Sequence, residues 1–122
     1  MNKFLKYNWP AILWAVVILW ASLMPSNNIP KIKIPNVDKG VHVFFYLVLS
    51  ILMSYGWKNQ ELFSSLRRSM LFKILMIASA YGFLIETMQG LFTADRQFDM
   101  LDVAANATGA ALGSLISVKL FK

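Results

Sequence analysis

Residues 40–57 read GVHVFFYLVLSILMSYGW, and the only ionisable side chains in this stretch are His42, Tyr46 and Tyr55. Apolar residues fill most of the other positions. A helix that crosses the hydrocarbon layer of a membrane, which is about 30 Å thick, needs about 20 mostly apolar residues. The stretch therefore predicts a transmembrane helix near residues 39–57.

Three more runs on either side of this stretch have the same character. Residues 7–30 and 103–118 carry no charge, and residues 74–85 are uncharged within a longer apolar run that includes Lys73 and Glu86. Each run is long enough to cross the membrane. The sequence therefore predicts an all-α, polytopic membrane protein, a four-transmembrane-helix bundle with short loops. The expected helices lie near residues 8–25, 39–57, 70–92 and 99–120.

The overall composition excludes a water-soluble monomer. The chain has 122 residues, and at roughly 100–200 residues per domain this is a single domain over 1–122. Its residues are 57% hydrophobic and 15% charged, against about 25% charged in soluble domains. So small a chain cannot bury that much apolar surface. The absence of cysteine and the single histidine also exclude disulfides, thiolate metal sites, cysteine nucleophiles and multi-histidine sites.

Positive charges gather near the two termini and in the second loop. Seven cations lie there: Lys3, Lys6, Lys58, Arg67, Arg68, Lys119 and Lys122. Four lie in or beside the first and third loops: Lys31, Lys33, Lys39 and Arg96. Because Lys and Arg favour cytoplasmic loops, we expect a cell-membrane protein with both termini in the cytoplasm. This bias accounts for the net charge of +6 without a nucleic-acid partner.

Polar side chains recur at helical spacing on three of the predicted helices, where residues three or four apart share a face. The second helix carries Asp38, Lys39, His42 and Tyr46, the third carries Glu86 and Gln89, and the fourth carries Asp99, Asp102 and Asn106, with Arg96 in the loop before it. The first helix contributes only Ser22. Polar groups within a membrane usually face the interior of the bundle, so these residues are candidates for a functional site.

The depths of these groups agree. At a rise of 1.5 Å per residue, Glu86 lies about 9 Å below Phe92, and Asn106 lies about 10 Å below Asp99. His42 lies about one turn inside the start of the second helix. We therefore expect the polar groups of three helices to converge in the outer third of the bilayer.

Each feature also has a structural interpretation. Asp99 or Asp102 could simply begin the fourth helix, since acidic residues are favoured there. Gly109 and Gly113 have a spacing that more often indicates close helix packing than a ligand site. A lone histidine could be a hydrogen-bonded residue at the membrane interface. Glu86 is harder to explain, because a carboxylate at that depth costs roughly 2.5–3.5 kcal/mol on insertion scales. An ion-pair network would offset this cost.

The polar residues also carry a resemblance to a known family. They form the motifs Asp38-Lys39-x-x-His42, Glu86-x-x-Gln89 and Arg96-x-x-Asp99-x-x-Asp102-x-x-x-Asn106-x-x-Gly109. In these motifs, and over nearly the whole chain, the sequence resembles the VanZ-like family. The resemblance implies a small bacterial polytopic membrane protein facing the cell envelope. The founding member of the family is associated with teicoplanin resistance, but the resemblance supplies no reaction.

Our first hypothesis is an enzyme that acts on a lipid or lipid-linked cell-wall headgroup at the outer interface. Glu86 would serve as a general acid or base, and Asp102 would orient His42 or hold a cation. Lys39 and Arg96 would hold a phosphate. No cofactor is evident, although oxygen ligands of this kind could bind a divalent cation such as Mg²⁺ or Mn²⁺.

Two other hypotheses use the same residues. The chain could bind or translocate an anionic lipid or peptidoglycan precursor without catalysis, as an oligomer, or the polar cluster could only fix the register of the bundle. The candidate catalytic residues are Glu86, Asp102, His42 and Asp99. The candidate ligand-binding residues are Asp38, Lys39, Gln89, Arg96, Asn106 and Tyr46.

Overall fold

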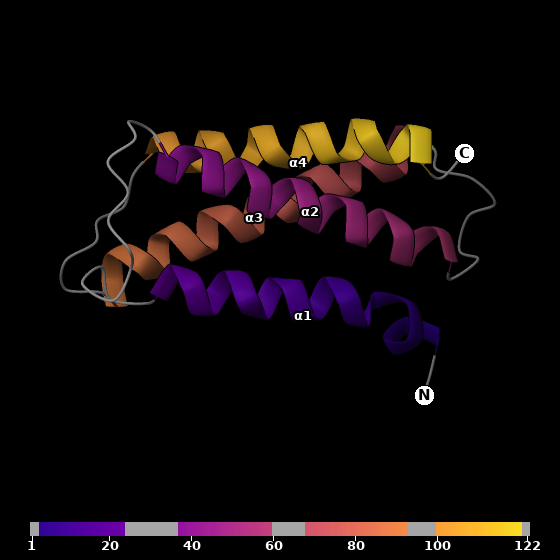
Figure 1. The fold of residues 1–122 in the computed structure, drawn as a ribbon, viewed down its shortest axis with the longest axis horizontal. Coiled ribbons are helices and arrows are strands. Elements are labelled where there is room, and N and C mark those ends of the chain that lie inside the picture. Colours follow the sequence, from indigo (N-terminus) through magenta and orange to yellow (C-terminus); the bar gives the residue numbers. More distant parts are fainter. Residues whose placement is uncertain (1–2, 24–36, 60–67, 93–99, 121–122) are drawn as a thin grey trace.

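The structure is a computed structural model that describes residues 3–23, 37–59, 68–92 and 100–120. Within these ranges the chain is helical throughout (Figure 1). The elements are α1 (Lys3–Leu23), α2 (Val37–Asn59), α3 (Arg68–Phe92) and α4 (Met100–Leu120). The predicted all-α fold is confirmed, and α2, α3 and α4 begin and end within a few residues of the predicted bounds.

The largest difference from prediction is at the start of α1. This helix begins at Lys3, ahead of the predicted start near residue 8, and it continues through Pro10. The uncharged run marks the apolar part of a helix rather than its first residue, so the polar turn before it was missed. Proline has no N–H to donate within a helix and disturbs the turn before it. In Figure 1 the first turns of α1 leave the line of the remainder.

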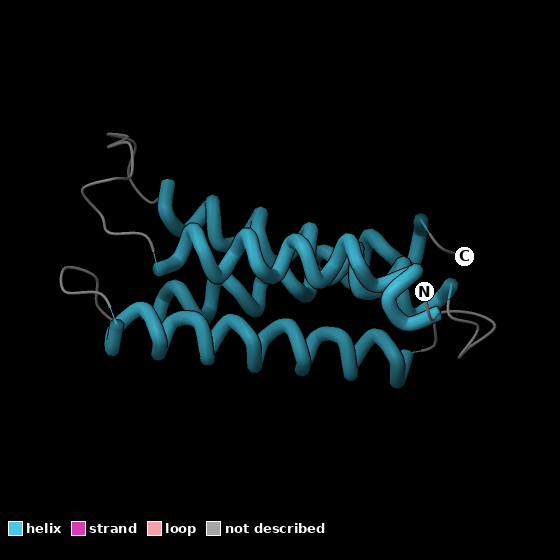
Figure 2. Tube along the Cα trace, turned by 90° about the horizontal axis from the view of Figure 1, so that it is seen from below, coloured by secondary structure: helices cyan, strands magenta, loops and turns pink. Residues whose placement is uncertain are grey.

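The helices form an up-and-down bundle. Successive helices run in opposite directions, α2 and α3 lie between α1 and α4, and both ends of the chain lie at the same end of the bundle (Figures 1 and 2). Contacts join α2 to α4, α3 to α4, α1 to α2, α2 to α3 and α1 to α3. The starts of α2 and α4 therefore meet the end of α3, at the end of the bundle opposite the termini.

The closest approach in the bundle is between α2 and α4, and two glycines allow it. A Cβ atom added to Gly109 would clash with the backbone carbonyl of Val43. A Cβ atom added to Gly113 would clash with the Leu47 carbonyl and the Ser50 hydroxyl. This confirms close helix packing as the structural role of the two glycines.

The exterior of the bundle is apolar, and much of its interior is polar. Trp20, Phe72, Leu91 and Leu115 are each more than 60% exposed. The buried polar side chains are Asn8, Ser22, His42, Ser50, Ser54, Glu86, Gln89, Asp102, Asn106, Ser114 and Ser117. Large apolar side chains exposed over the outside of the bundle, with polar side chains buried inside it, suit a lipid surrounding.

Three helices are long and apolar enough to cross a membrane, over Lys39–Lys58 in α2, Leu71–Phe92 in α3 and Met100–Leu120 in α4. α1, with 21 residues, is not among them. Lys3, Lys6, Asn8 and Pro10 interrupt the apolar character of its first half. The membrane character of the bundle is thus supported, and a crossing by α1 stays a prediction.

Serine hydroxyls in the α2–α4 interface are satisfied within their own helices. Ser54 donates to the Ser50 carbonyl at 2.8 Å, and Ser114 donates to the Ala110 carbonyl at 2.9 Å. Ser117 donates in the same way to the Gly113 carbonyl at 2.8 Å. These polar groups therefore need no partner on a neighbouring helix.

α1 is joined to the bundle by side chains that bond to backbone carbonyls. Trp14 Nε1 donates to the Phe45 carbonyl of α2 at 2.8 Å. Tyr81 Oη of α3 donates to the Ala15 carbonyl at 2.5 Å. Gln89 Nε2 donates to the Ser22 carbonyl at 2.9 Å. The expectation that Ser22 alone would contribute from the first helix understated this role, because sequence spacing does not report backbone acceptors.

Candidate functional site

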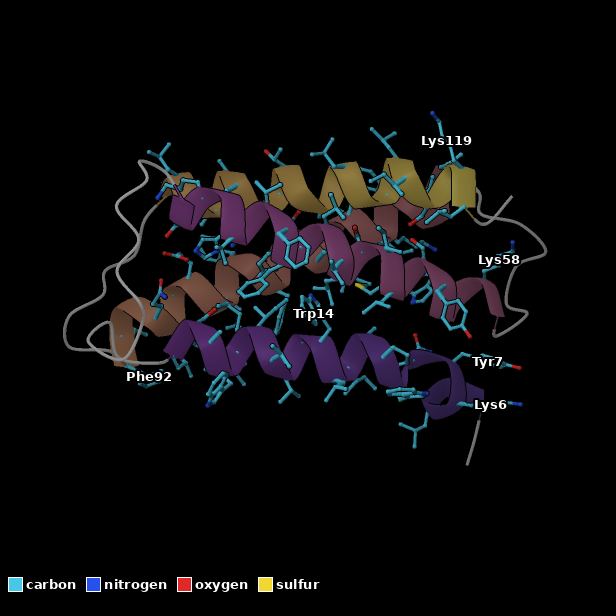
Figure 3. All side chains as sticks on the ribbon, viewed as in Figure 1. Lys6, Tyr7, Trp14, Lys58, Phe92 and Lys119 are labelled. Atoms are coloured by element: carbon cyan, nitrogen blue, oxygen red, sulfur yellow. The ribbon has the colours of Figure 1, made fainter. Side chains whose placement is uncertain are left out.

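The polar cluster lies at the end of the bundle opposite the chain termini. Lys39 and His42 lie in the first turns of α2, Glu86 lies near the end of α3, and Asp102 and Asn106 lie in the first turns of α4. In Figure 3, Phe92 marks this end, while the labelled lysines lie at the other. The predicted convergence of polar groups from three helices is therefore present in the fold.

Asp102 connects α4 to α2 through two basic groups. Its Oδ1 atom accepts a hydrogen bond from Lys39 Nζ at 2.5 Å, and its Oδ2 atom lies 3.6 Å from His42 Nε2. The side chain of Asp102 is 9% exposed and that of Lys39 is 23% exposed. Lys39 therefore lies at the rim of the cluster, where it reaches the surface, and Asp102 lies beneath it.

His42 is oriented by Asn106. The Asn106 Nδ2 group is 3.5 Å from the Gly82 carbonyl of α3, and its Oδ1 atom is 2.9 Å from His42 Nδ1. In this orientation the Asn106 amide turns its oxygen toward His42. Because Oδ1 can only accept a hydrogen bond, His42 Nδ1 is the donor and carries the proton. The other ring nitrogen, Nε2, consequently faces Asp102.

Gly82 is a residue that the sequence analysis missed. A Cβ atom at this position would lie 2.9 Å from both Cβ and Nδ2 of Asn106, so the absence of a side chain lets α3 approach α4 there. The available signal was the spacing of the small residues Ala78 and Gly82, four residues apart, a pattern typical of close helix packing. Gly82 positions Asn106 and, through it, His42.

Glu86 completes the buried cluster from α3. Its side chain has no exposed surface. One carboxylate oxygen of Glu86, one of Asp102 and a ring nitrogen of His42 all lie within 4.8 Å of one another. Two carboxylates and an imidazole can exchange protons with a substrate or share a cation.

Tyr46 lies one turn further into the bundle than His42. It is fully buried, and its ring centroid is 6.4 Å from that of Tyr81. Its hydroxyl makes no hydrogen bond to any residue that the structure describes. The predicted ligand-binding residue Tyr46 is thus one helical turn from the cluster, with a buried hydroxyl donor.

The remaining predicted residues are placed differently. Gln89 is buried, and its amide donates to α1 at Ser22, as described above. Arg96, Asp99 and the side chain of Asp38 lie outside the described residues. Their positions relative to the cluster stay predictions.

The fold and the cluster together define a class of protein. The chain is a small helical membrane protein, with spanning helices that bury carboxylates, a histidine and an asparagine at one end of the bundle. The comparison with known families is more specific, because the VanZ/LLP1 family model matches residues 4–122. The chain therefore belongs to the VanZ/LLP1 family, and the resemblance found in the sequence is confirmed. No curated protein and no solved structure matches the chain.

Proposed function

We propose that the chain binds, and acts on, the anionic headgroup of a lipid or lipid-linked cell-wall precursor at the outer face of the bacterial cell membrane. One observation carries this proposal: Lys39, His42, Glu86 and Asp102 converge at one end of a bundle with an apolar exterior. Ionisable groups buried in a membrane protein mark functional sites by default, because each is expensive to bury. A lipid keeps its tails in the bilayer while its headgroup reaches this depth.

The side chains suit a phosphate-bearing headgroup. The ammonium group of Lys39 lies at the rim and is a compact positive charge for a phosphate oxygen. Asp102 holds Lys39 in place, and an arriving anion would compete with Asp102 for it. His42 and Glu86 lie below, where one could accept a proton from an attacking group and the other could donate to a leaving group.

The charge distribution supports an outward-facing site. Lys6, Lys58 and Lys119 lie at the end of the bundle opposite the cluster (Figure 3). Since cations favour the cytoplasmic side, that end would face the cytoplasm and the cluster would face the envelope. A headgroup on the outer leaflet, or a precursor already carried across the membrane, would then be the accessible ligand. Through such a ligand the chain would affect susceptibility to glycopeptides.

Binding without turnover is the second candidate function. The partial exposure of Lys39 supports it, because one cation at the rim is sufficient to hold an anionic headgroup. The same cluster would then present or translocate the lipid, and an oligomer would supply the remaining walls of a path.

Mass spectrometry of envelope lipids and cell-wall precursors tests both candidates. The samples are cells that express the wild-type chain, Glu86→Gln or Thr108→Ala. Thr108 is exposed, and its hydroxyl bonds within α4 to the Ala104 carbonyl at 2.8 Å, so it is a matched control outside the cluster. We expect a species that changes with the wild-type chain and the control but not with Glu86→Gln.

Three results are distinguishable. A change confined to chains with an intact cluster supports an enzyme and identifies its substrate class. Unchanged profiles together with a lipid that co-purifies with the wild type, but not with Lys39→Ala, support binding. Unchanged profiles without a co-purifying lipid would refute both and leave the cluster with a structural role.

A further inference from the structure

We propose that His42, Glu86 and Asp102 form a binding site for one divalent transition-metal cation, with Zn²⁺ as the best fit. The site would be built from the residues of the proposed headgroup site. The role of the bound ion therefore rests on the proposed function, whereas metal binding itself can be measured without it. Each residue offers one ligand atom, and these atoms lie within 4.8 Å of one another. A small contraction would bring all three to the distances of about 2.0–2.2 Å typical of zinc with nitrogen and oxygen ligands.

The orientation of the His42 ring suits a cation ligand. Nδ1 lies 2.9 Å from the accepting Oδ1 of Asn106, so in a neutral imidazole that donates there Nε2 is the nitrogen with the lone pair. This lone pair faces Asp102 Oδ2 at 3.6 Å, and Glu86 contributes a further carboxylate oxygen to the same space. Lys39 pairs with the other oxygen of Asp102, Oδ1, whereas electron-pair donors that face one another in a medium of low polarity repel unless a positive charge lies between them. A metal ion would bind all three.

The surroundings of His42 match those of metal-binding histidines. Such a histidine usually donates its second ring nitrogen to an oxygen acceptor, which fixes the orientation of the ring and raises its basicity. Asn106 is that acceptor in this chain, and the Gly82 carbonyl fixes Asn106 in turn. The orienting group and the three ligands come from three different helices, so the folded bundle presents the site ready-made.

Tyr46 is an independent indication that something binds beside the cluster. Its side chain is fully buried, and its hydroxyl has no hydrogen-bond partner among the described residues. Buried hydroxyls in folded proteins nearly always have a partner. Tyr46 lies four residues, about one turn, from His42 on α2. A water or headgroup oxygen on the metal would accept a hydrogen bond from its hydroxyl.

The ligand set separates this site from a purely structural one. Structural zinc sites have four protein ligands, whereas catalytic sites have three and leave a position open to water or substrate. Three ligands are present among the described residues. Mixed imidazole and carboxylate ligands suit Zn²⁺ or Mn²⁺ better than Mg²⁺. With Lys39 at the rim, the open position would face an anionic headgroup.

Metal content of the purified full-length chain tests the proposal. The protein in detergent is stripped with a chelator, reloaded separately with Zn²⁺, Mn²⁺ or Mg²⁺, freed of loose ions by gel filtration and analysed by inductively coupled plasma mass spectrometry. We expect about one Zn²⁺ per chain, as in sites with three protein ligands. His42→Ala, Glu86→Gln and Asp102→Asn should lose this ion, and Thr108→Ala should keep it.

Two further variants show whether the ion is in this site rather than on the surface. Asn106→Ala removes no ligand and should weaken zinc affinity about 10- to 100-fold, as loss of an orienting group does elsewhere. Lys39→Met should strengthen binding, because Lys39 competes for Asp102 Oδ1. If His42→Ala does not fold, the isosteric Glu86→Gln and Asp102→Asn variants replace it. The visible absorption of Co²⁺ loaded in place of Zn²⁺ reports the ligand set directly.

The outcomes are clear in both directions. A wild-type chain that retains no more metal than the ligand variants, or variants that all bind equally, would overturn the proposal. Failure here is distinguishable from failure of the proposed function. A metal-loaded chain that neither changes envelope lipids nor co-purifies with one would refute the function alone, whereas an effect on lipids from a metal-free chain would refute the site alone.

Discussion

Substituting Gly109 by alanine should open the bundle at its tightest point. The added Cβ atom would meet the Val43 backbone carbonyl, and a backbone atom cannot move aside as a flexible side chain can. Restoring a normal C···O contact of about 3.3 Å requires α2 and α4 to separate by on the order of 1 Å. Overpacking of this kind destabilises proteins by about 1–3 kcal/mol.

Gly40→Ala is the matched control, because it adds the same atom to the facing helix. A Cβ atom at Gly40 would have no neighbour within 4 Å. Alanine stabilises a helix by roughly 0.5–1 kcal/mol relative to glycine. The two substitutions should therefore change the free energy of unfolding in opposite directions, although their chemistry is identical.

The free energy of unfolding can be measured by titrating the chain in mixed micelles with a denaturing detergent and following helicity by circular dichroism. We expect Gly109→Ala to lower the fraction of denaturing detergent at the midpoint of unfolding. Gly40→Ala should leave this midpoint unchanged or raise it. A difference of 1.4 kcal/mol between the variants is tenfold in the equilibrium constant. If Gly109→Ala proved as stable as Gly40→Ala, the inference that the glycine sets the α2–α4 distance would be wrong.

Three other predictions concern hydrogen bonds and orientation. Asn106→Ala should destabilise the bundle by about 1–3 kcal/mol, since the buried His42 donor loses its acceptor; an unchanged unfolding midpoint would contradict this. Tyr81→Phe should cost about 0.6–1.7 kcal/mol, the range for hydrogen bonds between membrane helices, and should increase proteolysis of α1. Because the chain has no cysteine, Lys6→Cys and Gly40→Cys can be labelled singly. In intact cells, an impermeant thiol reagent should modify the cysteine of Gly40→Cys but not that of Lys6→Cys. Labelling of both variants would refute the predicted crossing by α1.

Most of the fold could be predicted because charge placement alone separates helices from loops in such a chain. The uncharged runs predicted the bounds of α2, α3 and α4 to within a few residues, since membrane spans have a narrow range of lengths. They did not give the first turn of α1. Residues 3–8 include two lysines and an asparagine but are helical, and composition cannot distinguish such a turn from a loop.

The candidate site was predictable where a residue's own helix determines its position. Spacing placed His42 at the start of one helix with Lys39 beside it, and Asp102 and Asn106 on one face of another. In the structure Lys39 bonds to Asp102 and His42 bonds to Asn106. Spacing does not report how each helix is rotated against its neighbours. Gln89 shares a face with Glu86, yet its amide bonds to α1.

Backbone acceptors were the other feature beyond prediction. The carbonyls that accept from tyrosine, tryptophan and glutamine side chains belong to residues of no distinctive type, such as Ala15 and Phe45. Any residue has a carbonyl, so the acceptor leaves no trace in the sequence. Only the packed arrangement of helices identifies which carbonyl is in reach.

The position of α4 after the other three helices has a consequence for biosynthesis. Asp102 and Asn106 find their partners Lys39, His42 and Gly82 on helices made earlier, whereas the serines of α4 are satisfied by α4 itself. α4 can thus enter the bilayer on its own except for its first turns. A nascent chain that stops before α4 would hold His42 without its orienting partner, so any activity of the cluster arises only after α4 has been made.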